Sequence, residues 1–276
     1  MPLPKGKPNA HPGFNPGIPA AFNSLEEARN SLDYQGSLCI QNAIDFQHWK
    51  HLEEGTETQE HRDAFNADRI RFRAIFDKWM TAFQEFLDRN VAIMNSKLLQ
   101  GAMVLKMNAK LAVVHLETDM FQFPEEKCWD KVKPFFEDLV DLAAAVIDAQ
   151  RAADQTLLQK PIFQLDHSII GPLFTVSHKC RDPTLRRKAI SLLYSAPRQE
   201  GVWDSILTAR VCERIVNLEE EGLGEVKCAA DIPDWKRISE IQVTFDLQAR
   251  SGEIKFTRLR NRQSGFREPV IDVFEW

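Results

Sequence analysis

Residues Asp166 to Glu221 read DHSIIGPLFTVSHKCRDPTLRRKAISLLYSAPRQEGVWDSILTARVCERIVNLEEE. Asp182 directly precedes Pro183, a pair typical of a helix start, because the carboxylate accepts backbone N–H groups while proline occupies the first helical position. Apolar residues then recur at steps of three and four, namely Leu185, Ala189, Leu192 and Leu193. This pattern predicts an amphipathic helix that begins near Pro183 and ends at Pro197.

The polar side of this predicted helix carries Arg186, Arg187 and Lys188, which we expect to face water. A second amphipathic run follows, and its expected buried side consists of Val202, Ile206, Ala209, Ile215 and Leu218. Gly222 and Gly224 come directly after it and supply the left-handed conformation that ends many helices. The stretch therefore predicts two packed helices joined by a proline break.

Helical periodicity continues toward the N-terminus. The spacing predicts a short helix that opens at Asn23 and further helices over 37–53, 68–90, 98–116 and 129–146. The apolar face expected for the helix over 37–53 consists of Cys39, Ile40, Ala43, Ile44, Phe46, Trp49 and Leu52. An aromatic seam in the helix over 68–90 consists of Phe72, Phe76, Trp79, Phe83 and Phe86. Such a seam is typical of a protein core.

A two-residue alternation replaces the helical pattern near the C-terminus. Apolar Ile241, Val243 and Phe245 alternate with polar neighbours, and the same pattern resumes at Ile254 and Phe256. This pattern predicts a β-hairpin over 238–260 that packs on the helices. The Pro/Gly-rich residues 1–22 are expected to form a flexible tail. We therefore predict a mainly α fold of stacked antiparallel helical hairpins, with a small C-terminal β-hairpin, in one domain over 23–276.

Composition narrows the class of protein. The formal net charge of -5 argues against a chain built to coat nucleic acid. Five cysteines are scattered, odd in number and without a CxxC pair, so we expect reduced thiols inside a cell. No apolar run reaches the length of a membrane span, and the N-terminus lacks the apolar core of a signal peptide.

Candidate metal ligands and nucleophiles are few. His167, His178 and Cys180 lie near one another, yet their spacing is not that of a zinc pair on one helix. Cys180, Ser168 and Ser205 lack the local signature of a nucleophilic enzyme, and the sequence has no P-loop, GxGxxG or HExxH motif. We therefore assign no catalytic, cofactor-binding or metal-binding residue and expect no cofactor and no enzymatic activity.

Charged residues form two further groups. The acidic pair Glu125–Glu126 and the run Glu219–Glu221 are expected to be solvated at helix ends or faces. Basic residues gather around the predicted hairpin, namely Lys255, Arg258, Arg260, Arg262 and Arg267. They are compatible with phosphate contacts, but aromatic residues between them are limited to Phe256 and Phe266, and the rest of the chain is acidic. We favour a solvated or acid-paired face and assign no DNA-binding residue.

The order and spacing of three segments carry a family resemblance. These segments are Asp166–Phe174, Lys179–Ile190 and Arg198–Ser205. Together they resemble the C-terminal regulatory region of fungal zinc binuclear-cluster transcription factors. Phe76–Leu87 and the predicted helix around Leu98 to Leu105 are similar to the helices that precede that region. The resemblance extends over about residues 23–276 and is strongest from Asp166 to Asp204.

The resemblance implies a nuclear regulator whose helical domain modulates transcription through a protein partner or a small-molecule effector. The family's DNA-binding head requires six closely spaced cysteines that hold two zinc ions, and this chain has no counterpart of them. Sequence-specific DNA binding by the chain alone is therefore not expected. The alternative is a helical interaction scaffold that binds no ligand and has no link to DNA. For the protein itself we expect an intracellular location, in the nucleus or else in the cytoplasm.

Overall fold

The computed structural model describes residues 17–52, 59–118, 126–153, 162–164, 168–260 and 267–276. The chain divides into two compact units, Met1–Asn95 and Ser96–Trp276. Helices dominate both units, as predicted, and strands occur in the second. The two units are described separately below.

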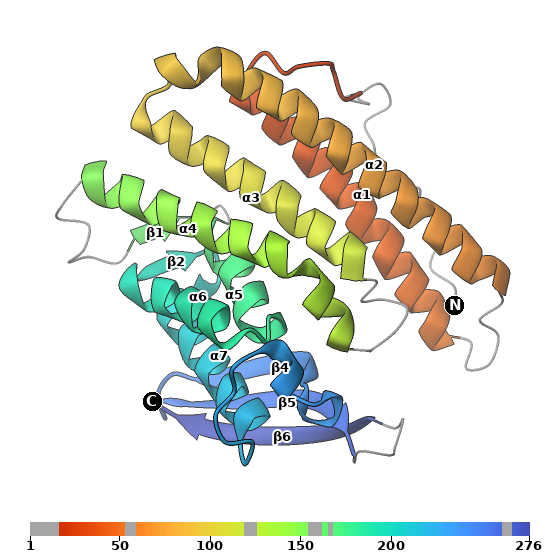
Figure 1. Ribbon diagram of the computed structural model, residues 1–276, viewed down its shortest axis with the longest axis vertical. Helices are drawn as coiled ribbons and strands as arrows, with labels where there is room; N and C mark the ends of the chain where they lie inside the picture. The colour runs from red at the N-terminus through yellow and green to blue at the C-terminus, as the bar shows by residue number, and fades with distance from the viewer. Residues whose placement is uncertain (1–16, 53–58, 119–125, 154–161, 165–167, 261–266) are drawn as a thin grey trace. The chain divides into compact units, whose positions relative to one another are not determined.

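The first unit is built on two long helices that lie side by side (Figure 1), α1 (Leu25–Leu52) and α2 (Gln59–Asn90), followed by a 3₁₀ turn at Val91–Ile93. The predicted aromatic seam of α2 is confirmed, because all five of its rings are buried. Trp79 stacks on Phe83 with ring centroids 4.6 Å apart, and its Nε1 donates to the carbonyl of Ala28 at 3.0 Å. Phe22, the last residue of the predicted tail, is fully buried against Trp79.

The prediction of two separate helices over residues 23–53 was wrong, since α1 is continuous from Leu25 to Leu52. The predicted apolar face was also partly wrong, because Ile40 and Ile44 are 62% and 51% exposed. Ala43 is buried as expected, and Ile44 lies one residue farther on, about 100° around the helix. The side chains of Phe46, Trp49 and Leu52 lie outside the described residues.

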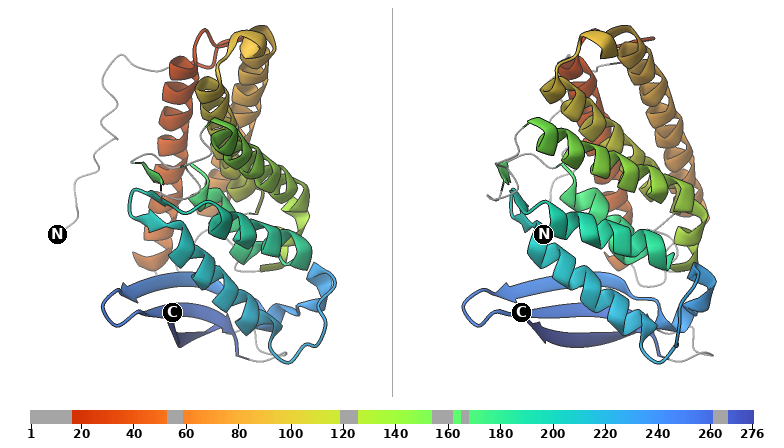
Figure 2. Two further views of the ribbon diagram at one scale, coloured as in Figure 1. Left: turned by 90° about the vertical axis from the view of Figure 1, so that its left-hand side faces the viewer. Right: turned by 60° about the vertical axis from the view of Figure 1, so that its left-hand side comes forward.

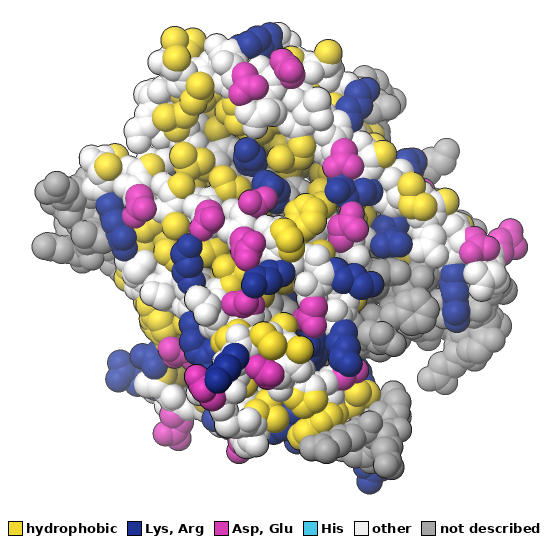
Figure 3. Space-filling model, viewed as in Figure 1, with side chains coloured by type: hydrophobic (Ala, Val, Ile, Leu, Met, Phe, Trp, Pro, Cys, Tyr) yellow, Lys and Arg dark blue, Asp and Glu magenta, His cyan; other side chains and the backbone are white. Residues whose placement is uncertain are grey.

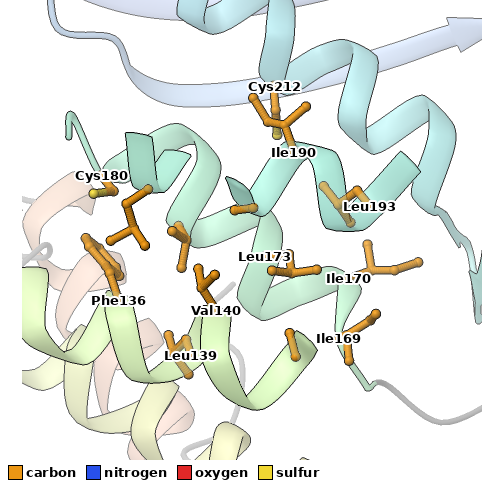
Figure 4. Close-up of a cluster of buried hydrophobic side chains, with 14 of the residues drawn as sticks. Phe136, Leu139, Val140, Ile169, Ile170, Leu173, Cys180, Ile190, Leu193 and Cys212 are labelled. Carbon is orange, nitrogen blue, oxygen red and sulfur yellow. The ribbon is translucent and has the colours of Figure 1, made fainter. Parts of the chain in front are cut away.

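Among its described residues, the second unit has five α-helices: α3 (Ser96–Thr118), α4 (Lys133–Ala153), α5 (Ile170–Lys179), α6 (Pro183–Ser195) and α7 (Ser205–Glu220). A 3₁₀ segment, Glu126–Val132, leads into α4. Apolar side chains from α4 to α7 converge in one core (Figure 4), in which Phe136, Leu173 and Cys212 are fully buried. Leu98, expected on the buried side of α3, is 44% exposed near its start.

Short strands replace the loop expected between α6 and α7. Strand β2 (Arg198–Glu200) pairs in parallel with β1 (Ile162–Gln164) and antiparallel with β3 (Trp203–Asp204). The second helix therefore begins at Ser205, with Asp204 as its N-cap, and not at Val202. Val202 is 91% exposed, so its predicted burial was wrong, and the neighbouring Trp203 is 40% exposed.

The predicted hairpin is part of a larger sheet. Strands β4 (Ser239–Asp246) and β5 (Ser251–Leu259) pair antiparallel, and β6 (Arg267–Glu275) pairs with the other side of β5. Two 3₁₀ turns, Ala229–Asp231 and Asp234–Lys236, precede this sheet. Helix α7 packs on one face of the sheet (Figure 2), with Val211 and Ile215 against Ile254 and Phe256.

Candidate functional site

The corner between α5 and α6 has the predicted helix-start geometry. Asp182 is the N-cap of α6, and its Oδ1 accepts the backbone N–H of Leu185 at 3.0 Å, while Pro183 is the first helical residue. Asp182 Oδ2 also accepts a hydrogen bond from Lys133 Nζ at 2.8 Å, which joins the corner to the start of α4. Lys133 is about half exposed, so we expect the ion pair to stabilise less than the cap.

A buried carboxylate, Glu219 of α7, ties this corner to two other elements. Its Oε1 accepts from Arg181 Nη2 at 2.7 Å, and its Oε2 accepts from Arg186 Nη2 at 2.9 Å. The backbone N–H of Ile238 donates to the same Oε1 at 2.8 Å. The three charged side chains are fully buried. One carboxylate thus fixes the α5–α6 corner, α7 and the entry to the C-terminal sheet.

The network continues through Glu126, in the 3₁₀ segment before α4. Lys179 Nζ donates to its Oε1 at 2.8 Å, and Arg181 Nη2 lies 2.9 Å from its Oε2. Arg237, just before the sheet, binds the carboxylate of Asp130 with two hydrogen bonds of 2.9 Å each. A fork-shaped guanidinium contact of this kind fixes geometry as well as charge. These pairs anchor the 3₁₀ segment to α5 and to the sheet.

The electrostatics of the network favour the charged form of Glu219. Burial alone would raise the pKa of Glu219, but Arg181 and Arg186 outweigh it and hold that pKa below its usual value. Burial lowers the pKa of Lys179, and the Glu126 carboxylate partly opposes this effect. The stability of each buried charge therefore depends on its partner.

Three residues of this network were wrongly assigned to solvent from the sequence. Glu219 and Glu126 were expected to be solvated, yet they are 0% and 4% exposed. Arg186, expected on the polar side of its helix, is 0% exposed. Glu219 lies four residues after buried Ile215, so helical spacing alone puts it on the buried face. A charged residue at a spacing of four from a buried apolar residue was therefore the sequence signal that pointed to a buried ion pair.

Another buried carboxylate, Glu200 on β2, caps the start of α5. It accepts backbone N–H groups from Ser168, Ile169 and Ile170 at 2.8 to 3.1 Å. A helix start leaves such donors without intrahelical partners, and a negative charge there also complements the helix dipole. Arg198 Nη1 lies 3.9 Å from the same carboxylate. Glu200 therefore holds α5 in place from a strand 30 residues later in the chain.

The residues considered for chemistry do not form a reactive group. His178 is buried and its Nδ1 lies 2.7 Å from the carbonyl of Phe174, while burial lowers its pKa well below the usual range. Burial raises the pKa of Cys180 to about 11, which disfavours the thiolate. Ser205 Oγ accepts the backbone N–H of Arg198 at 3.0 Å. His167 lies outside the described residues, within which no three His, Cys, Asp or Glu side chains gather as a metal site requires.

The basic residues near the sheet are interleaved with acids. Lys255 Nζ lies 3.2 Å from Glu253 Oε1, and Arg260 Nε lies 3.9 Å from Glu268 Oε2. Arg258 faces Glu268 in the strand register, and Arg267 Nη1 donates to Ser239 Oγ at 2.9 Å. Arg262 lies outside the described residues. On the face drawn in Figure 3, basic and acidic side chains also alternate. This arrangement is compatible with the solvated or acid-paired face favoured from the sequence.

A shallow groove of about 520 Å³ lies between α6 and α7. It is lined by Arg187, Ile190, Ser191, Tyr194, Glu213, Val216 and Asn217. Tyr194 Oη donates to Glu213 Oε2 at 2.6 Å, and Arg187 Nη2 donates to Glu220 Oε2 at 2.5 Å beside it. The groove combines buried apolar residues, Ile190 and Val216, with hydrogen-bonding side chains, a mixture typical of ligand-binding sites.

None of the helices in the described part of the chain is long and apolar enough to cross a bilayer. The buried ion network joins the corner between α5 and α6 to α7, because Arg181 and Arg186 both pair with Glu219. Its chemical contribution is to hold helices together.

Comparison with known proteins gives one informative match. Over 118 residues the chain is 33% identical to the aspercryptin biosynthesis cluster-specific transcription regulator of Emericella nidulans. The match covers 41% of this chain and 18% of that protein, so the chain spans only a small part of its relative. No family model and no solved structure matches the chain. The similarity suggests a transcription-factor-related protein.

Proposed function

We propose that this chain is the regulatory module of a transcription-factor-like protein that acts in the nucleus and is not an enzyme. The observation that carries the proposal is the 118-residue similarity to a cluster-specific transcription regulator. The module is proposed to extend over residues 23–276, with residues 1–22 as a linker, and to be related to the regulatory region of fungal zinc binuclear-cluster factors. DNA binding would come from another part of the protein or from a partner.

The buried network supports a regulatory role over a catalytic one. Its arginines and carboxylates neutralise one another between α5, α6 and α7, and the guanidiniums of Arg181 and Arg186 are 0% exposed. An active site instead exposes polar groups to substrate. The sequence segments that carry the family resemblance contain Arg181, Arg186 and Glu200. These residues fix the positions of α5, α6 and α7 relative to one another.

We further propose that an effector or a partner segment binds in the groove between α6 and α7. Both helices that line the groove also enter the ion network, α6 through Arg186 and α7 through Glu219. Binding that favours one spacing of these helices would therefore bias the position of the α5–α6 corner. The hydroxyl of Tyr194 and the carboxylate of Glu213 suit a ligand that offers hydrogen-bond donors beside an apolar group.

A tethering experiment tests this function. The full chain is fused to an unrelated DNA-binding module, and transcription of a reporter is compared with that from the module alone. We expect a several-fold change in reporter transcription. Ser191→Trp, which fills the groove from α6, should reduce that change, whereas Thr184→Trp, exposed on the same helix outside the groove, should not.

A fusion that leaves transcription unchanged, with the fold verified by circular dichroism, contradicts the regulatory proposal and favours the scaffold alternative. Chromatin immunoprecipitation of the native protein separates the two as well. Enrichment at discrete promoters supports a regulator, and its absence supports a scaffold. Equal effects of the two tryptophan variants reject the groove but not the regulatory role.

A further inference from the structure

The outer strand of the C-terminal sheet, β6, has an open edge. The strand order is β4-β5-β6, and no other strand pairs with the far side of β6 among the residues described. Two large apolar side chains of this strand are exposed, Ile271 at 60% and Val273 at 63%. An edge strand with unpaired backbone groups and apolar side chains is a template for pairing with another strand.

The backbone groups that face this edge follow from the register. The N–H of Trp276 donates to the carbonyl of Arg250, and the pairing of β6 with β5 continues without a shift from Glu275 to Arg267. Backbone groups alternate in direction along an antiparallel strand, so those of odd-numbered residues from 267 to 275 point away from β5. Pro269, the residue without an N–H, is one of them, the placement that proline tolerates in a sheet.

The side chains of these odd-numbered residues read Arg267, Pro269, Ile271, Val273 and Glu275. This row is complementary to itself when reversed. Antiparallel pairing with a second copy, centred on Ile271, puts Ile271 opposite Ile271, Pro269 opposite Val273 and Arg267 opposite Glu275. Apolar side chains then meet apolar ones on this face. The Arg267 guanidinium is held by Ser239 Oγ within its own copy, so the contact rests on the apolar pairs and the backbone.

Other registers are less favourable. Centring on Pro269 puts the two prolines opposite each other, which removes two donors from one pair. Centring on Val273 leaves Arg267 beyond the partner strand and puts the Glu275 carboxylate opposite Ile271. Pairing centred on Ile271 also joins all nine residues of β6 with those of the copy. Length and the position of proline therefore favour the register centred on Ile271 over these two.

We propose that two copies of this chain associate through β6, antiparallel about Ile271, to form one continuous six-stranded sheet. The contact is isologous, because the same strand serves both copies. Arg214 of α7 binds Asp272 through two hydrogen bonds of 2.6 Å. The Asp272 carboxylate therefore lies on the face of the sheet that packs on α7, opposite the face that carries the odd-numbered side chains of β6. The proposal is independent of the regulatory function and of the groove between α6 and α7.

The test measures molar mass by light scattering and sedimentation, over a range of concentrations, for the full chain of 31.7 kDa. We expect a dimer of the unaltered chain. Ile271→Lys should weaken dimerisation about a hundredfold or more, because it brings two like charges together at the two-fold axis. Thr244→Lys adds the same exposed charge on the opposite edge strand and should leave the dimer intact. Val273→Lys serves as a second disrupting variant.

A mixing experiment tests the register. Ile271→Lys and Ile271→Glu should each be monomeric alone, and a mixture of the two should dimerise, because Lys and Glu then face each other. A monomeric unaltered chain at all concentrations overturns the proposal. So does a dimer that survives Ile271→Lys and Val273→Lys, or a mixture that stays monomeric while circular dichroism shows both chains folded.

Discussion

Arg181 and Glu219 form an ion pair in the interior of the second unit, with Arg181 Nη2 2.7 Å from Glu219 Oε1 and both side chains fully buried. Arg181 follows α5 and Glu219 lies in the last turn of α7, so the pair joins elements that are 38 residues apart in sequence. Removal of one member of such a pair costs more than the pair contributes, because it leaves an uncompensated buried charge.

Glu219→Gln should therefore destabilise the fold strongly. The substitution retains the shape of the side chain but leaves Arg181 and Arg186 without their shared countercharge. We expect a loss of about 3–5 kcal/mol in the free energy of unfolding, measured by urea denaturation. Glu221→Gln, an exposed site two residues later, is the control and should change it by less than about 0.5 kcal/mol. Similar losses at both positions would contradict the assigned role of Glu219.

Two tryptophans should respond differently to truncation. Trp79 is fully buried and donates to the carbonyl of Ala28, so Trp79→Ala should cost about 3–5 kcal/mol. Trp203 is 40% exposed and contacts Phe174 at its inner side, with centroids 5.5 Å apart, so Trp203→Ala should cost about 1 kcal/mol. Thermal and urea unfolding followed by circular dichroism measures both. A larger loss of stability for Trp203→Ala than for Trp79→Ala would contradict the assignment of Trp79 as the more buried of the two residues.

Local signals in the sequence predicted part of this fold. The Asp182–Pro183 helix start and the aromatic seam of α2 were predictable, because capping and helical spacing act over a few residues. Strands β1 to β3 were not, since segments of two or three residues carry no periodicity and exist through pairing with distant segments. Buried Arg186 was missed for a related reason: its countercharge lies 33 residues away in α7.

Acidification should destabilise the protein through two histidines. Burial, then the charge of Lys179, lowers the pKa of His115 to about 4, and burial lowers that of His178 well below 6.5. Between pH 6.5 and about 4 the unfolded chain thus binds more protons than the folded one, so stability falls as pH falls. Each histidine contributes up to about 1.4 kcal/mol per pH unit. Urea unfolding from pH 7 to 5 measures this slope, which His115→Gln should reduce; an unchanged slope would argue against a neutral His115.

Asp182 allows the helix cap and the ion pair to be separated. Asp182→Asn retains an oxygen that can accept the N–H of Leu185 but removes the charge that faces Lys133, so it should cost less than about 1 kcal/mol. Asp182→Ala removes both and should cost about 1–2 kcal/mol. The difference between the two variants in urea unfolding gives the contribution of the cap. Equal losses of stability in Asp182→Asn and Asp182→Ala would indicate that the ion pair with Lys133 contributes more than the helix cap.

Gly252 on β5 should not tolerate even a methyl group. A Cβ built on Gly252 lies 2.5 Å from Cζ of Phe274, the residue opposite it on β6, so the ring occupies the space that a side chain would need. Gly252→Ala must displace Phe274, which also packs edge-on against Phe245, and we expect a loss of about 1–3 kcal/mol. In Gly252→Ala/Phe274→Leu the smaller, flexible side chain relieves the clash, so the double variant should lose less than the sum of the two single variants. Hydrogen exchange of the β6 backbone amides measures the loss of stability in this sheet. If the losses of the two single variants simply add in the double variant, the Phe274 ring is not what excludes a side chain at position 252.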